Sequence, residues 1–97
     1  MRVRVLIRGV VQGVGFRAFV ARLARRFGIK GYVRNMPTGE VEAVFDGEES
    51  KVRLMIEFCK RGPPLARVEG IEVEEIDEDE RFLGFKAEEP FILVNLL

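Results

Sequence analysis

The sequence has no histidine, no tryptophan and a single cysteine among its 97 residues. The lack of histidine excludes Ser-His and Cys-His catalytic pairs and zinc sites built on histidine. A single cysteine, Cys59, cannot form an internal disulfide, and its place on an apolar helical face indicates a small core residue. Ser50 and Thr38 are the only aliphatic hydroxyls. We interpret them as backbone partners at a helix start and in a turn, not as nucleophiles.

No apolar run of 18 residues is present, so we expect no membrane-spanning segment and no membrane partner. The chain begins with charged residues at Arg2 and Arg4, where a signal peptide would need its apolar region. We therefore expect the protein to be cytoplasmic. Its length suits one domain, which we place at residues 1–97.

Side-chain amides are rare, because the chain holds only Gln12, Asn35 and Asn95. Together with abundant Glu and Arg, this resembles the composition of heat-adapted proteins, which avoid thermolabile amides. We therefore predict a thermostable protein. In such a sequence we expect the remaining amides to have specific functions. Gln12 and Asn35 both fall inside the motifs described below.

Acidic residues are missing from the first 39 positions, although the net charge of the whole chain is zero. A field of this kind attracts small anions. We expect most of the early basic residues to pair with acidic residues of later strands, and only Arg17 to serve an anion directly. The basic residues of this segment are Arg2, Arg4, Arg8, Arg17, Arg22, Arg25, Arg26, Lys30 and Arg34.

Hydrophobic periodicity predicts the order strand, helix, strand, strand, helix, strand. The strands are expected at residues 2–7, 30–35, 40–45 and 67–76, with a weaker one at 82–87 and a bulge at Gly70. The helices are expected from about Phe16 to Gly28 and from Ser50 to Gly62. This order is the ferredoxin-like split βαβ pattern (βαββαβ), an α+β sandwich of one antiparallel sheet with two helices on one face. Arg2, Arg4, Glu40 and Glu42 are expected on the open face.

The segment between the first strand and first helix holds three glycines in seven residues, Gly9 to Gly15. Glycine permits positive φ, so the loop can turn its N–H groups inward, and a helix N-terminus directly follows. A cation such as Arg17 in the first helical turn is unfavourable beside the helix dipole, unless an anion occupies the loop. The loop therefore predicts a nest for one phosphoryl group with a guanidinium fork beside it. It lacks the ending of a nucleotide P-loop.

Two separate stretches carry a family resemblance. The run from Ile7 to Arg17, IRGVVQGVGFR, resembles the first signature of the acylphosphatase family. The run Gly31 to Asn35, followed by Gly39, Val41 and Gly47, resembles the second. The similarity continues through residues 62–68 to about Ala87.

The resemblance implies a hydrolase that splits the carboxyl–phosphate bond of small acyl phosphates without metal or cofactor, releasing a carboxylate and inorganic phosphate. It implies that Arg17 binds the phosphoryl oxygens and that Asn35 orients the attacking water. Inorganic phosphate is then both product and inhibitor. We interpret Gln12 as shaping the loop. The phosphate cradle is implied at Val11, Gln12, Gly13, Val14, Gly15 and Phe16.

Two alternatives stay open at this point. The module also resembles the N-terminal, carbamoyl-phosphate-processing domain of hydrogenase maturation proteins, but 97 residues favour a free-standing enzyme. A non-catalytic ferredoxin-like binding module is the other, since fold alone does not fix function. Nucleic acid is not an expected partner. RNA-binding domains with this fold expose aromatic residues on the central strands, where this chain has charged residues.

The last ten residues, 88–97, form an apolar extension beyond the family's usual end. The extension is too short to span a bilayer. We expect it to pack against the domain or against a second copy, which leaves a monomer and a tail-mediated dimer as alternatives.

Overall fold

The computed structural model describes residues 1–78 and 81–88. The expected βαββαβ order is confirmed, and a short fifth strand follows it. Of the apolar extension, residues 88–97, only Glu88 is described; residues 89–97 lie outside the described residues. The elements are β1 (Arg2–Val10), α1 (Phe16–Arg26), β2 (Lys30–Asn35), β3 (Val41–Asp46), α2 (Glu49–Arg61), β4 (Arg67–Glu75) and β5 (Phe85–Glu88).

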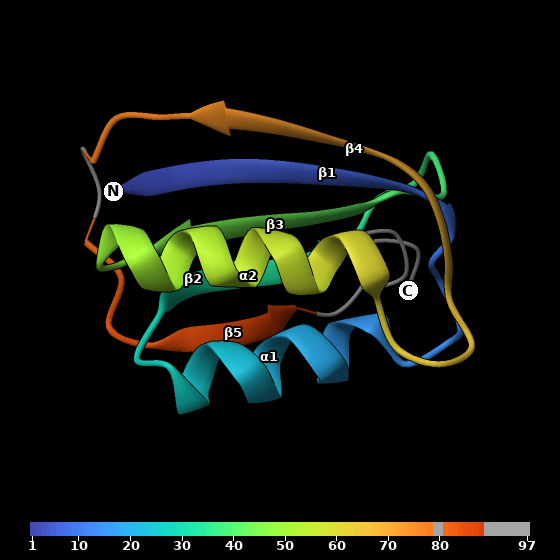
Figure 1. Ribbon diagram of the computed structural model, residues 1–97, viewed down its shortest axis with the longest axis horizontal. Coiled ribbons are helices and arrows are strands. Elements are labelled where there is room, and N and C mark those ends of the chain that lie inside the picture. The colour runs from blue at the N-terminus through green and yellow to red at the C-terminus, as the bar shows by residue number, and fades with distance from the viewer. Residues whose placement is uncertain (79–80, 89–97) are drawn as a thin grey trace, which may run out of the picture.

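The five strands form one sheet in the order β4-β1-β3-β2-β5, and both helices cover the same face (Figure 1). Strands β1, β2, β3 and β4 pair antiparallel, as expected. Strand β5 pairs parallel with β2, so the sheet is mixed and the expectation of a wholly antiparallel sheet is wrong in this strand. The chain leaves β4 at one edge and crosses to the opposite edge, where it enters β5 in the direction of β2.

The core lies between the sheet and the two helices. Alternate residues of β1 face this core, because Val3, Val5 and Ile7 are all buried. Phe85 of β5 stacks on Phe45 of β3, with 6.0 Å between ring centroids, and so ties the edge strand to the centre of the sheet. The helices contribute apolar stripes at helical spacing: Phe16, Val20, Ala21 and Ala24 from α1, and Val52, Met55 and Cys59 from α2.

Two charged residues expected to face solvent are buried instead. Arg2 is 4% exposed: its Nη2 donates to Asp46 Oδ2 at 3.2 Å, and its guanidinium lies 4.5 Å from the ring centre of Phe82. The segment leading into β5 therefore covers part of the open face. Glu42 is 2% exposed because Arg4 and Arg34, on the strands to either side, both donate to its carboxylate. Pairing within the sheet thus removes these charges from water.

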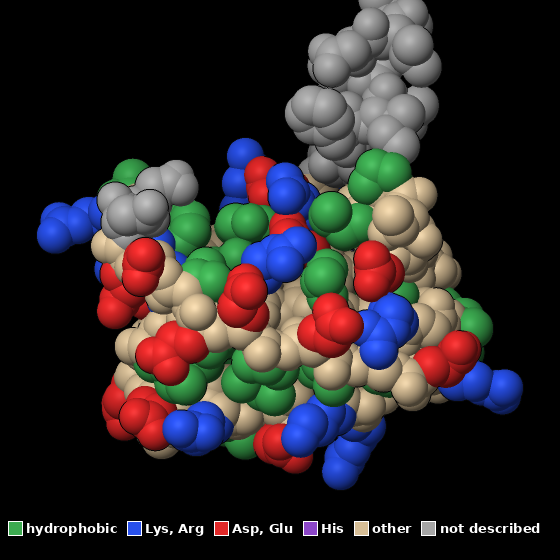
Figure 2. Space-filling model, turned by 90° about the horizontal axis from the view of Figure 1, so that it is seen from above, with side chains coloured by type: hydrophobic (Ala, Val, Ile, Leu, Met, Phe, Trp, Pro, Cys, Tyr) green, Lys and Arg blue, Asp and Glu red, His purple; other side chains and the backbone are tan. Residues whose placement is uncertain are grey.

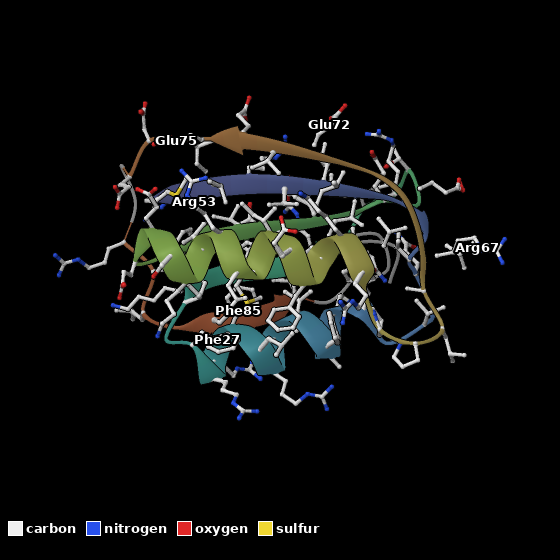
Figure 3. All side chains as sticks on the ribbon, viewed as in Figure 1. Phe27, Arg53, Arg67, Glu72, Glu75 and Phe85 are labelled. Atoms are coloured by element: carbon white, nitrogen blue, oxygen red, sulfur yellow. The ribbon has the colours of Figure 1, made fainter. Side chains whose placement is uncertain are left out.

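The edge strand β4 has a bulge where the sequence predicted one. Arg8 pairs with Gly70 and Gly9 pairs with Val68, which leaves Glu69 as an extra residue. Beyond the bulge, β1 continues to Val10, three residues further than expected, because it still pairs with the start of β4. Glu72 and Glu75 point outward from this edge (Figure 3).

The N-cap of helix α2 lies two residues earlier than predicted. Glu48 is the N-cap residue, and Ser50 lies inside the first turn, where its hydroxyl donates to the Glu48 carboxylate at 2.9 Å. The expected capping role of Ser50 is therefore wrong. In the part of the chain that the structure describes, no helix is long and apolar enough to cross a membrane.

Candidate active site

The loop that joins β1 to α1 takes its shape from two glycines in the left-handed region. Gly13 has φ 75° and Gly15 has φ 82°, conformations that residues with a Cβ rarely adopt. A Cβ built on either glycine would meet no atom within 4 Å, so backbone conformation and not crowding requires glycine here. Gly15 is also the N-cap residue of α1, so the loop ends at the start of the helix.

The N-terminus of α1 offers positive charge to this loop. An α-helix leaves its first N–H groups without intrahelical acceptors, and its dipole is positive at that end. Among residues 1–78 and 81–88, no side-chain hydrogen bond caps the N-terminus of α1, and the first turn holds no acidic residue. The arrangement favours an anion of phosphate size.

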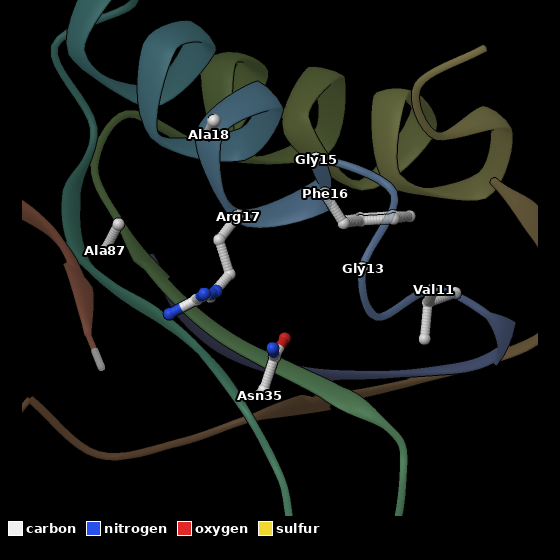
Figure 4. A pocket seen from close by; sticks show the side chains of 8 residues that line it. All are labelled: Val11, Gly13, Gly15, Phe16, Arg17, Ala18, Asn35 and Ala87. Carbon is white, nitrogen blue, oxygen red and sulfur yellow. The ribbon is translucent and has the colours of Figure 1, made fainter. Parts of the chain in front are cut away.

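Arg17 projects from the first turn of α1 toward Asn35 and the end of β5 (Figure 4). Its Nη1 donates to the backbone carbonyl of Glu88 at 2.6 Å. A guanidinium carries five N–H donors, so this bond orients the group and engages only part of its fork. Arg17 is half-buried, and its charge is therefore weakened by water less than that of an exposed arginine.

Asn35 is the last residue of β2 and pairs with Val41 of β3. Its side chain is half-buried and lies beside the Arg17 guanidinium (Figure 4). An amide is neutral and can both donate and accept hydrogen bonds. Such a group can hold a water molecule without adding negative charge near a phosphate.

These groups line one cavity of about 290 Å³. Six of the eight residues proposed from the sequence lie on its wall: Val11, Gly13, Gly15, Phe16, Arg17 and Asn35. Two do not. Val14 packs against the core, and Gln12 directs its amide to the turn between β2 and β3.

Sequence reasoning missed three contributors to the site. Ala18 and Ala87 complete the cavity wall, and the carbonyl of Glu88 holds Arg17. Ala18 follows Arg17 directly, so its position in the first helical turn was a usable signal. Ala87 and Glu88 reach the site only because β5 pairs with β2, which no local pattern reveals.

Other reactive side chains lie away from this cavity. Cys59 is fully buried on α2, and burial raises the pKa of its thiol to about 12. Its interpretation as a core residue is confirmed. The Thr38 hydroxyl donates to the Glu40 carboxylate at 2.9 Å. Among residues 1–78 and 81–88, no group of three or more Asp, Glu, His or Cys side chains could share a metal ion.

Comparison with known proteins places the chain among relatives of its own size. Residues 3–87 match the family model described as Acylphosphatase. The curated acylphosphatase of Caldivirga maquilingensis is 52% identical over 88 residues, which is 90% of this chain and 93% of that protein. The acylphosphatase of Rubrobacter xylanophilus is 55% identical over 86 residues, 89% of this chain and 78% of that one.

Solved structures of related proteins have the same fold as this chain. The crystal structure of acylphosphatase from Bacillus subtilis superposes with a TM-score of 0.86 at 34% identity, covering 90% of this chain and 97% of that one. Full-length HypF, solved in a phosphate- and nucleotide-bound form, gives a TM-score of 0.83 at 33% identity. That match covers 92% of this chain and only 12% of HypF.

Proposed function

The chain belongs to the acylphosphatase family, and on that premise we propose that its glycine-rich loop, Arg17 and Asn35 carry out the family's reaction. The protein is an acylphosphatase, an enzyme whose substrates are small acyl phosphates. The observation that supports the assignment of residues is that the loop, the arginine and the asparagine line one cavity.

The loop and Arg17 bind the phosphoryl group. The N–H groups of residues 11–16 and the N-terminus of α1 surround the phosphoryl oxygens, and the guanidinium takes two of them in a fork. Glu88 holds the guanidinium in place through its carbonyl. Charge on the phosphoryl oxygens is stabilised in the substrate and in the transition state, which is the larger part of catalysis in phosphoryl transfer.

Asn35 positions the nucleophile. Its amide holds a water molecule in line with the bond from phosphorus to the acyl oxygen. The water oxygen forms a bond to phosphorus as the bond to the acyl oxygen breaks, and the acyl group leaves as a carboxylate. One water proton passes to a phosphoryl oxygen and the other stays on the attacking oxygen, so the second product is dihydrogen phosphate. A carboxylate is a weak base, so its departure needs no general acid, in agreement with a chain that has no histidine.

A hydrolysis assay tests this mechanism. The purified protein with a chelator present should hydrolyse an acyl phosphate and leave a simple phosphate monoester nearly untouched, because a monoester leaving group needs a proton donor. Inorganic phosphate should inhibit competitively, since it occupies the same loop. A strict requirement for a divalent metal would overturn the mechanism.

A further inference from the structure

Gln12, the only glutamine of the chain, forms a bridge between two parts of the site. Its side-chain nitrogen donates to the carbonyl oxygen of Met36 at 2.8 Å and to that of Glu40 at 2.9 Å. Gln12 itself lies in the loop between β1 and α1. The two carbonyls lie in the turn between β2 and β3, which begins directly after Asn35. Both hydrogens of one amide therefore connect the phosphate loop to the end of the strand that carries Asn35.

The turn is closed without Gln12. The Met36 N–H donates to the Glu40 carbonyl at 2.8 Å, and the Gly39 N–H donates to the Met36 carbonyl at 3.0 Å. A carbonyl oxygen has two lone pairs, so the amide of Gln12 uses the second acceptor position on each. The bridge therefore adds nothing to the closure of the turn. What it fixes is the position of the turn relative to a loop 24 and 28 residues away in the sequence.

We propose that Gln12 is a positioning residue that sets the distance between the phosphoryl group in the loop and the water held by Asn35. The inference rests on the proposed function, in which the loop binds phosphate and Asn35 binds water. In-line attack requires both groups at a fixed separation and angle, and a misplacement of about 1 Å costs about 10²-fold in rate. Glutamine suits this task because it is neutral, reaches across the gap and presents two donors on one atom.

Two substitutions remove the bridge in different ways. Gln12→Ala removes the side chain with both donors, and Gln12→Met keeps a neutral side chain of similar length that has no donor. Each should lower kcat about 10²-fold while changing the inhibition constant for inorganic phosphate less than about threefold. Thr38→Ala is the matched control, because it alters the same turn and leaves the bridge intact. It should keep kcat within about twofold.

A double-mutant cycle distinguishes positioning from a general effect on the fold. If Gln12 acts through Asn35, then Gln12→Ala combined with Asn35→Ala should be no slower than Asn35→Ala alone. Losses that multiply would overturn the proposal, as would a folded Gln12→Ala enzyme with kcat within twofold of the parent. A loss of phosphate affinity as large as the loss of kcat would also contradict it. If Gln12→Ala does not fold, the same criteria apply to Gln12→Met. Near-normal turnover in Asn35→Ala would instead refute the proposed role of Asn35, on which this inference rests.

Discussion

At the scale of single residues, Arg17 is expected to act on the phosphoryl group throughout the reaction. Arg17→Ala should therefore weaken inhibition by phosphate and reduce turnover together, the latter by roughly 10³-fold. Arg17→Lys should recover little, because a point charge replaces neither the fork nor the bond to the Glu88 carbonyl. Steady-state kinetics with phosphate as inhibitor measures both effects. Full activity in the lysine variant would show that charge alone is sufficient.

Asn35 should give a different result, because we assign it to the water and not to the phosphate. Asn35→Ala should lower kcat strongly and leave the phosphate inhibition constant nearly unchanged. Circular dichroism should first establish that the variant is folded, since an asparagine before a turn can also serve stability. A variant that loses phosphate affinity as badly as Arg17→Ala would contradict the assignment.

Cys59 supplies a pH prediction at the same scale. Burial raises the pKa of its thiol from 9.0 to about 12, so the folded state retains a proton that the unfolded state releases. The contribution of this proton to the free energy of unfolding is fully present below pH 9. It is lost as the pH rises toward 12, by up to about 1.4 kcal/mol per pH unit. Denaturant unfolding at pH 8 to 11 should show a steeper decline for the parent than for Cys59→Ala. Burial also raises the pKa of Tyr32, but this contribution is common to both proteins and cancels.

At the scale of elements, the sheet is joined by a buried carboxylate. Glu42 of β3 accepts a hydrogen bond from Arg4 of β1 at 2.5 Å and from Arg34 of β2 at 2.6 Å. Glu42→Gln keeps the shape but replaces two charge-assisted bonds, and we expect a loss of about 2 kcal/mol. For a domain of this size that lowers Tm by about 10 °C.

Glu72→Gln is the control for this prediction. Glu72 pairs with Arg8 at 3.2 Å, and both side chains are exposed. An exposed pair contributes little, so the loss should stay below about 0.5 kcal/mol. Equal losses of unfolding free energy in the two variants would show that burial of Glu42 at the centre of the sheet does not strengthen its ion pairs.

Elements with a strong local pattern could be predicted from the sequence, and those defined by distant pairing could not. The alternation of Val3, Val5 and Ile7 and the helical spacing of α1 are local features. The parallel pairing of β5 depends on where the chain arrives after crossing the sheet. The burial of Arg2 and Glu42 depends on neighbouring strands that no window of sequence contains.

At the scale of the whole molecule, folding pairs part of the basic N-terminal segment with later acidic residues. The predicted pairing of early arginines with later acids is confirmed for Arg2, Arg4, Arg8 and Arg34. Viewed from the β4 side, acidic and basic side chains are interspersed (Figure 2). This face therefore has no broad region of one charge sign that would steer an anionic substrate.

In the site, as in the fold, only residues marked by a local sequence pattern could be predicted. The loop, Arg17 and Asn35 could be named in advance because glycine spacing and signature residues mark them. The Gln12 bridge and the Glu88 carbonyl could not, because a backbone acceptor leaves no trace in a sequence.

The cavity wall consists of six residues between Val11 and Ala18, together with Asn35 and Ala87. These segments are distant in the sequence and meet only in the folded chain. Inorganic phosphate should therefore bind the native state and ignore the unfolded one. Thermodynamic linkage then raises the free energy of unfolding by about 2.7 kcal/mol when the phosphate concentration is 100 times its Kd. The protein in a phosphate buffer and in a phosphate-free buffer would thus show two different stabilities, and the gap between them would report the affinity of the site without any substrate being turned over.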